Sequence, residues 1–252
     1  MPSHFSSIGF RVETREEFGA LARQAADKGQ EISTGQGFYI CWSPGAEVQL
    51  WLQTSLSHAP AGCNPHFAGS SRVEVAVTAA LPNDKRPLDG SFHCWAEPRD
   101  GMESGAYPFL FDCPDFAIAA QSREYPFHAE AQVTAFAEDL TCYTSESAYT
   151  EAQRESGKGP GLAAEAFIPS GLFTENSARP RATAVFTGRI LEAERRANPV
   201  TSAEFYWLSV QSYGGIYDVV ADPTFFQEPP VVGGIVKGSF WLSGRLLMDE
   251  HV

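Results

Sequence analysis

Two histidine–carboxylate pairs have the spacing in this chain that is best suited to metal chemistry. His93 shares strand parity with Glu97, and His128 shares it with Glu130, so each pair would project from one face of an extended segment. Imidazole and carboxylate groups are common zinc ligands, and His66 would complete such a set. No second pair stands at a recognised metal-site spacing, so the alternative is that these histidines are surface or hydrogen-bonded residues.

Motifs for nucleophilic or nucleotide chemistry are missing from the sequence. It contains no GxSxG elbow, no P-loop lysine motif and no GxGxxG after a predicted strand. The five cysteines are scattered without a CxxC pair, which is typical of reduced thiols in a cytoplasmic protein. The sequence therefore predicts no cofactor and leans away from an enzyme.

Composition indicates a folded protein that does not favour polyanions. The 252 residues are 43% hydrophobic and 19% charged, with a formal net charge of −13. Such an acidic surface repels phosphate backbones and anionic lipids, so nucleic acid is disfavoured as a partner. No membrane-length apolar run and no secretory signal pattern occur. A protein partner or a second copy of the chain stays open.

The N-terminal block predicts a strand, a helix and two further strands. Residues 6–12 alternate in polarity, which favours a half-buried strand. Thr14 and Glu17 then form a capping box, and Gly29 is a suitable stop for the helix. Two strands are expected over 37–42 and 47–53.

This order resembles the βαβββ half-module of the vicinal-oxygen-chelate (glyoxalase-type) proteins. Many members hold a metal with a His on the first strand and a Glu on a later one. Those positions fall on Ser7 and Gln49 here, which departs from the pattern. The resemblance implies, as one hypothesis, a metal-dependent enzyme that uses Gln49, His66, His93 or His128.

A polar strand face is the best candidate for ligand binding in this block. The strand expected over 47–53 alternates so that four side chains share one face: Glu47, Gln49, Trp51 and Gln53. The strand expected over 6–12 adds Arg11 to that face. This face would be a ligand-binding floor. The alternative is a solvated face or an interface.

The middle of the chain predicts mainly antiparallel strands with few helices. Strands are expected over 72–81, 91–97, 107–112 and 128–143, and a helix over 145–155. We therefore predict an α+β domain over residues 1–173. The acidic residues Asp112 and Asp115 flank Cys113-Pro114, either as an acidic pair or as part of a turn.

The C-terminal block resembles an OB-fold. A polar stretch over 174–180 reads as a linker, and strands follow over 182–195, 204–211, 216–221 and 234–246. We predict a small OB-like β-barrel over residues 181–252. Phe240 and Trp241 are adjacent and should face opposite sides, with Phe240 inside.

An OB-like barrel raises single-stranded nucleic-acid binding as a second alternative, with Arg189, Trp241 and Arg245 on its surface. With no catalytic motif and an acidic charge, the preferred hypothesis is a non-catalytic binding or scaffold protein.

Overall fold

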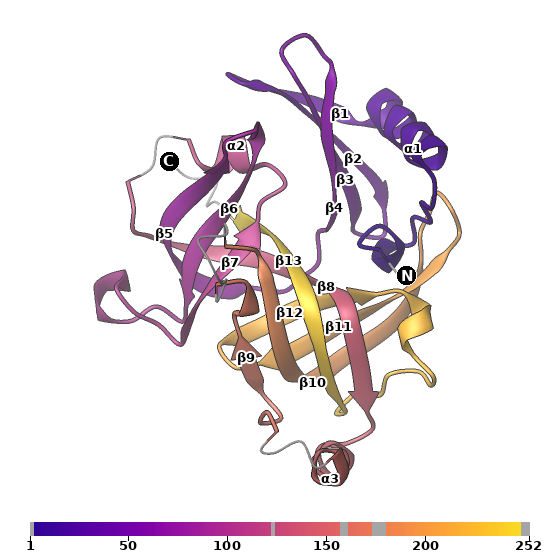
Figure 1. The fold of residues 1–252 in the computed structure, drawn as a ribbon, viewed down its shortest axis with the longest axis vertical. Coiled ribbons are helices and arrows are strands. Elements are labelled where there is room, and N and C mark those ends of the chain that lie inside the picture. The colour runs from indigo at the N-terminus through magenta and orange to yellow at the C-terminus, as the bar shows by residue number, and fades with distance from the viewer. Residues whose placement is uncertain (1–2, 122–123, 157–160, 173–179, 248–252) are drawn as a thin grey trace.

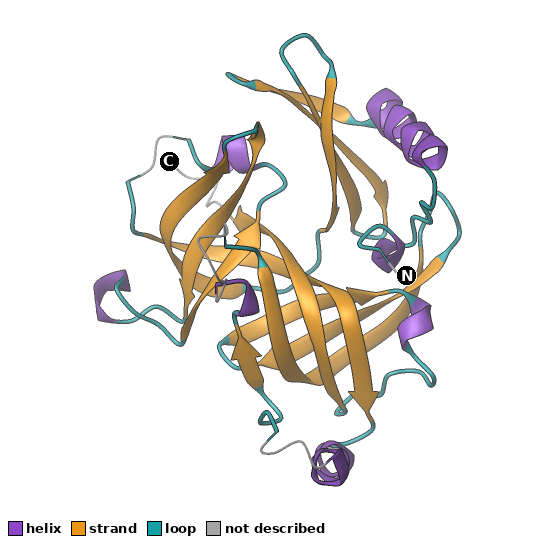
Figure 2. Cartoon of the chain, viewed as in Figure 1, coloured by secondary structure: helices purple, strands orange, loops and turns teal. Residues whose placement is uncertain are grey.

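The computed structural model describes residues 3–121, 124–156, 161–172 and 180–247 (Figure 1). The fold is α+β and mainly antiparallel, as predicted, with strands throughout and the few helices at the periphery (Figure 2). Its strands form a four-stranded sheet, called sheet A, and a nine-stranded sheet, called sheet B, which is closed into a ring over part of its width. No helix in the described ranges is long and apolar enough to cross a membrane.

Sheet A is an antiparallel meander covered on one face by a helix. Its strands are β1 (Gln30–Thr34), β2 (Gly37–Gly45), β3 (Val48–Thr54) and β4 (Pro60–Phe67), paired in chain order. The helix α1 (Arg15–Lys28) begins with the predicted capping box. Its buried Leu21 and Ala25 pack with Ile40 and Leu50 of the sheet.

The strand predicted over residues 6–12 is wrong. The chain forms a 3-10 turn there, η1 (Ser6–Ile8), and Gly9 takes a left-handed conformation with φ of 78°. The apolar alternation arises because Ile8 and Phe10 are both buried in an irregular segment. The block is thus a helix followed by four strands, which departs from the βαβββ layout.

Sheet B holds the remaining strands. These are β5 (Val73–Asn83), β6 (Arg86–Ala96), β7 (Tyr107–Asp112), β8 (Phe127–Tyr143), β9 (Ala166–Ile168), β10 (Thr183–Ala197), β11 (Glu204–Ser212), β12 (Gly215–Ala221) and β13 (Ile235–Leu247). Two helices, α2 (Phe116–Ala119) and α3 (Glu146–Ser156), and the short turns η2 (Asp100–Met102), η3 (Ser170–Leu172) and η4 (Pro223–Phe225) connect them.

Five strands of sheet B close a barrel. The meander β10–β11–β12 runs into β8 through a parallel pairing, β8 pairs antiparallel with β13, and β13 returns to β10. Four of these strands come from the predicted barrel segment, but β8 precedes it in sequence. The division at 173/181 itself stays a prediction, and the expected linker lies outside the described residues except for Pro180.

The β8–β13 ribbon also belongs to a second circuit. From β8 the sheet continues through β5 and β6 to β7, and β7 reaches β13 through the single pairing of Asp112 with Ser243. β8 and β13 therefore belong to both circuits, and Asp112 lies where the second one closes.

The barrel interior is packed with aromatic side chains. Phe240 is fully buried and stacks on Phe186 with ring centroids 4.1 Å apart, and Phe186 in turn stacks on Phe167. The prediction that Phe240 points inward and Trp241 outward is confirmed, because Trp241 packs outside against Phe136. The described side chains inside the barrel therefore form a packed core.

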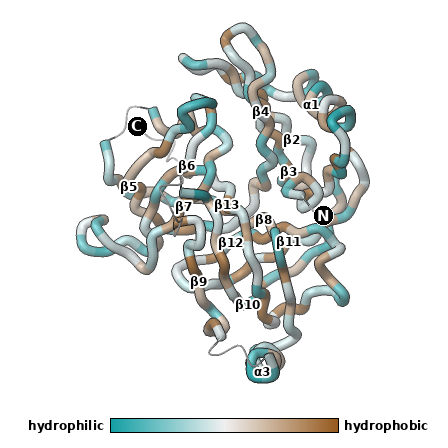
Figure 3. The backbone as a smooth tube through the Cα atoms, in the orientation of Figure 1, coloured by the Kyte–Doolittle hydropathy of each residue, from teal (hydrophilic) through white to brown (hydrophobic). Residues whose placement is uncertain are grey.

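Sheet A and the N-terminal segment cover one outer side of the barrel. Phe205 and Trp207 of β11 and Val220 of β12 share a buried cluster with Ile8 and Phe10. Hydrophobic stretches accordingly follow the barrel strands (Figure 3). This apolar contact fixes sheet A against the barrel. Along β13, sheet A and the barrel are also joined by polar side chains.

Candidate functional site

The second face of sheet A meets β13 and the loop around α2 through polar and aromatic side chains. Trp51 of β3 is buried, lies edge-on to Tyr39 and has the Arg245 guanidinium 5.1 Å from its ring centroid. Arg245 also forms a two-pronged ion pair with Asp115, at 2.7 and 2.9 Å. Such a cation over an indole face is attracted by the ring quadrupole. Sheet A and β13 are thus joined by charge as well as by packing.

The polar face predicted on β3 is largely part of this junction. Gln49, Trp51 and Gln53 share one face, where the Gln49 amide oxygen accepts from Trp51 Nε1 at 2.9 Å. Gln53 is buried, so the face is an interface at this point rather than an open floor. Glu47 is exposed and pairs with Arg196 at 2.8 Å, and exposed Arg11 lines a shallow hollow near the β10–β11 turn.

Asp89, at the beginning of β6, is a buried carboxylate with three donors around it. Its Oδ1 accepts from the Gln53 amide and from Asn64 Nδ2 at 3.0 Å, and its Oδ2 lies 2.8 Å from Arg86 Nε in an ion pair. Two of these donors belong to sheet A and the third to the same hairpin as Asp89. Asp89 therefore fixes the β5–β6 hairpin against sheet A, and its position forms one wall of a cavity.

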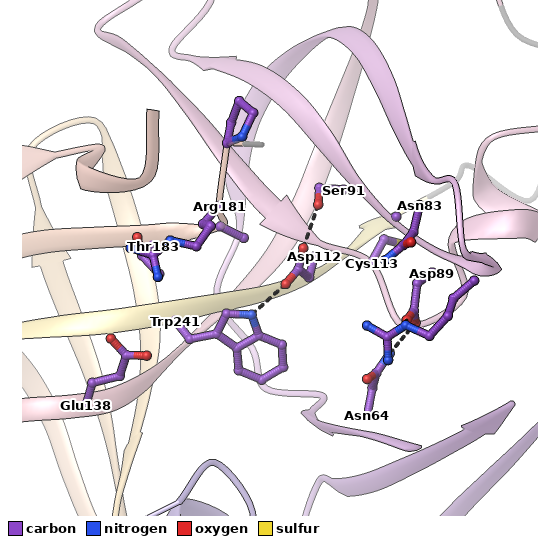
Figure 4. A pocket seen from close by; sticks show the side chains of 14 residues that line it. Asn64, Asn83, Asp89, Ser91, Asp112, Cys113, Glu138, Arg181, Thr183 and Trp241 are labelled. Carbon is purple, nitrogen blue, oxygen red and sulfur yellow. Dashed lines mark hydrogen bonds and ion pairs between the residues drawn. The ribbon is translucent and has the colours of Figure 1, made fainter. Parts of the chain in front are cut away.

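This cavity, called the junction cavity, has a volume of about 320 Å³ and opens between sheet A, the β6–β7 region and the segment leading into β10 (Figure 4). Its lining carries carboxylates and guanidinium groups together with amides, hydroxyls and one indole. The charged and aromatic lining residues are Arg86, Asp89, Asp112, Glu138, Arg181 and Trp241. Its volume is at the lower end of the range for small-molecule sites, and its lining is more polar than is usual for them.

Asp112 and Trp241 form the middle of the junction cavity. Trp241 Nε1 donates to Asp112 Oδ2 at 2.7 Å, and the Ser91 hydroxyl donates to Asp112 Oδ1 at 2.5 Å. In Figure 4 this pair lies between Arg181, Thr183 and Glu138 on one side and Asn64, Asn83 and Asp89 on the other. These two hydrogen bonds orient the carboxylate before any ligand arrives.

The N-terminal segment packs onto the indole of Trp241. The His4 ring stacks on it with centroids 4.4 Å apart and planes 13° from parallel, and His4 Nε2 lies 3.5 Å from Glu138 Oε1. Burial lowers the pKa of His4 below its ordinary value, although the Glu138 carboxylate opposes that shift. One face of the indole is therefore occupied, and Trp241 offers its edge more than an open face.

The histidines predicted as metal ligands are not brought together. His93 Nδ1 lies 2.6 Å from the Thr78 hydroxyl, whereas His128 pairs with Glu74 at 3.3 Å on the exposed face of β5 and β8. Glu130 lies opposite Glu74 in the same pairing. Across the described ranges, no group of three or more His, Cys, Asp or Glu side chains is placed to share a metal ion.

His66 lies instead inside the junction between sheet A and β13. It is fully buried, and its Nδ1 is 2.9 Å from the Ser243 hydroxyl. Burial lowers its pKa to about 3, and the nearby Arg245 adds to the shift. His66 is neutral at physiological pH and joins two sheets.

The cysteines offer no activated thiol. Cys94 and Cys113 are fully buried, and burial raises the pKa of both well above the ordinary value. Cys113 lines the cavity but donates to Asp115 Oδ1 at 3.1 Å, and that carboxylate also disfavours a thiolate. Cys63 is similarly shifted, to a pKa of about 12.

The basic residues predicted on the barrel surface do not form a shared groove. Arg189, in the middle of β10 and opposite the first residue of β13, pairs with Glu146 at 2.7 Å and Glu165 at 3.6 Å. Arg245 pairs with Asp115 near the other end of β13. Each guanidinium already has a carboxylate partner, which leaves little charge for a nucleic-acid backbone.

Sequence reasoning missed most residues of the junction cavity. Asp89, Arg181 and Glu138 come from three separated segments with no shared spacing, and only the chain pairings of sheet B bring them together. Two lining residues do stand out in the sequence, Asp112 as half of an acidic pair and Trp241 as a candidate on the barrel surface. In the structure Asp112 bonds to Trp241, and Asp115 bonds to Arg245.

Chemically, the junction cavity can hold a ligand with several hydrogen bonds and charges, and its Cys113 thiol is held protonated. Comparison with protein-family models, with curated proteins and with solved structures finds no match to this chain. Its function must therefore be argued from the geometry of this cavity.

Proposed function

We propose that the protein is a non-catalytic binding protein that takes a small polar ligand in the junction cavity. The observation that carries this proposal is the fixed Asp112 carboxylate, held by Ser91 and Trp241 inside a cavity of about 320 Å³. Preorganised polar groups in a concave site are the usual basis of small-molecule recognition, because little ordering entropy is lost on binding.

We further propose that the closed ring is a barrel of the OB type whose usual binding face is not available. Five strands and a three-stranded meander support this relation. OB-folds that bind oligonucleotides use the face of strands 2 and 3, whose places β11 and β12 take here. The outer side chains Phe205, Trp207 and Val220 of that face are buried under the N-terminal block. This burial favours a small ligand at the junction over a nucleic-acid strand.

A cytoplasmic location fits the same proposal. The five cysteines are free thiols, and burial raises the pKa of each of them, to about 12 for Cys63 and Cys142.

The proposed function is tested by thermal shift and native mass spectrometry of the purified protein. The probes are pools of amino acids, monosaccharides, organic acids and polyamines, and we expect one pool to raise the melting temperature by several degrees. Asp112→Asn should remove most of that rise, because the ligand loses a charged partner. Asp27→Asn, an exposed change on α1, should leave it intact. No shift with any pool, together with no adduct in the native spectrum, would overturn the proposal.

A further inference from the structure

The charges that line the junction cavity are of both signs. Three carboxylates, of Asp89, Asp112 and Glu138, face two guanidinium groups, of Arg86 and Arg181. Asp89 and Arg86 form an ion pair at 2.8 Å, so their charges cancel at that end of the cavity. Among the described lining residues, the other end holds the carboxylates of Asp112 and Glu138 and the guanidinium of Arg181.

Arg181 differs from the basic residues of the barrel surface. It is exposed, lines the cavity and has no ion pair within the described residues, whereas Arg189 and Arg245 are both paired with carboxylates. Both backbone polar groups of Arg181 are hydrogen-bonded. Its N–H donates to the Gly171 carbonyl, and its C=O accepts from the Thr183 N–H. A guanidinium in this position suits the planar, two-oxygen geometry of a carboxylate.

Glu138 supplies the complementary charge. Its partner within the described residues is His4, at 3.5 Å, and the lowered pKa of His4 keeps that ring mostly neutral near pH 7. The Glu138 carboxylate therefore lacks a permanent cation at this contact. Together with Asp112 it favours a ligand ammonium group, which can donate to two acceptors at once.

From these groups we propose that the ligand is a small zwitterion of the α-amino-acid class, with its carboxylate on Arg181 and its ammonium group between Asp112 and Glu138. This deepens the proposed function and rests on it. A simple anion would meet three carboxylates, and a simple amine would leave Arg181 unused. A sugar is disfavoured because the face of Trp241 on which it would stack is covered by His4.

The test is isothermal titration of the full chain with each of the twenty L-amino acids. Three further probes each lack part of the zwitterion. Propylamine carries only the positive charge, propionate carries only the negative charge, and glucose carries neither. We expect at least one amino acid to bind, and each of these three probes to bind at least tenfold more weakly or not at all.

Variants locate the two ends of the ligand. Arg181→Gln should weaken amino-acid binding at least tenfold, because the ligand carboxylate loses its partner, and should leave any measurable propylamine binding unchanged. Glu138→Gln should weaken both the amino acid and propylamine. Arg154→Gln, an exposed change on α3, should alter neither.

The possible failures are distinguishable. If glucose, propylamine or propionate binds as tightly as any amino acid, or if Arg181→Gln has no effect, the zwitterion is wrong while binding in the cavity stands. If all twenty amino acids and all three probes fail to bind, and native mass spectrometry shows no copurified adduct, both proposals are wrong. Circular dichroism and the melting temperature of each variant separate lost binding from lost folding.

Discussion

At the scale of single residues, buried polar side chains join strands of sheet B to one another and to the loop that follows β4. Asp218 is fully buried and accepts from the Ser71 N–H at 3.0 Å and from Gln132 Nε2 and Trp207 Nε1 at 2.8 Å each. His66 has a similar place nearer the cavity. Such groups cost free energy when a partner is removed, because the remaining atoms cannot regain water. Asp218 therefore fixes the loop after β4 against sheet B, and His66 fixes β4 itself against β13.

His66 should make stability depend on pH in a defined window. Its pKa is about 3 in the folded protein and has the ordinary value near 6.5 when unfolded. Between these values the unfolded chain binds one more proton, so the free energy of unfolding falls as pH falls from 6.5 toward 3. Each pKa unit between the folded and unfolded values corresponds to about 1.4 kcal/mol. The free energy of unfolding should therefore fall by several kcal/mol at low pH.

The measurement is urea unfolding at pH 7 and pH 5. His66→Gln keeps a side chain that can hydrogen-bond to Ser243 but does not titrate. The free energy of unfolding of this variant should therefore change less between pH 7 and pH 5 than that of the wild type. His58→Gln alters an exposed ring and should keep the wild-type slope. A wild-type slope in the His66 variant would show that another group, such as His93, dominates.

At the scale of elements, the N-terminal segment is held against the turn between β10 and β11. Asn198 is fully buried and donates from Nδ2 to the Ile8 carbonyl at 2.7 Å, and the Thr201 hydroxyl donates to the Gly9 carbonyl at 2.6 Å. Gly9 allows this approach because it has a positive φ and lies against Asn198. The same segment carries His4 onto Trp241, so its docking shapes the junction cavity.

Gly9→Ala tests that docking, with Gly233→Ala as its match. Gly9 has φ of 78° and Gly233 of 82°, so both changes carry similar strain, about 1 kcal/mol. A Cβ at Gly9 would lie 2.6 Å from Asn198 Cβ and 2.8 Å from the Ala203 carbonyl oxygen, whereas one at Gly233 meets nothing within 4 Å. We expect Gly9→Ala to lower the free energy of unfolding by at least ~2 kcal/mol more than Gly233→Ala. Equal losses in chemical denaturation would contradict the docking.

Strand patterns in the sequence predict much of sheet B and little of the site. The long alternating strands β8, β10 and β13 were found because one face of each is buried. β4 was missed because its residues 60–67 include two prolines and a glycine, which read as breakers although an edge strand tolerates them. β1 and β9 are short edge strands with too few residues for a pattern.

The cavity escaped prediction for a different reason. Asp89 and Asp112 lie at the ends of neighbouring strands, but Glu138 is on β8 and Arg181 immediately precedes β10. Periodicity reports which face of one strand is buried, and it carries no information on which distant strands pair. The error at residues 6–12 has a related origin, since burial of Ile8 and Phe10 imitates a strand without any partner strand.

At the scale of the whole molecule, the β8–β13 ribbon ties the barrel to the rest of sheet B. β13 pairs with β8 from Ile235 to Leu247, and β8 pairs in turn with β5 and β12. Neither circuit is complete without this ribbon. The structure therefore predicts one cooperative unfolding unit for sheet B, although the sequence suggests a boundary near residue 173.

This is tested by urea unfolding followed by far-UV circular dichroism and tryptophan fluorescence. We expect the two signals to change together in a single transition. Residues 181–252 expressed alone should be unfolded, because β12 and β13 would lack the strand between them. A cooperative transition in that fragment would instead support two independent domains.

The upstream origin of β8 also has a consequence for synthesis. At about 5–20 residues per second, β8 leaves the ribosome seconds before β12 and β13 exist. During that interval its apolar face, with Val133, Ala135 and Ala137, and its unpaired edge are open to other nascent chains. We expect yield in cells to respond to holdase chaperones and to slower translation more strongly than for a barrel whose strands emerge consecutively.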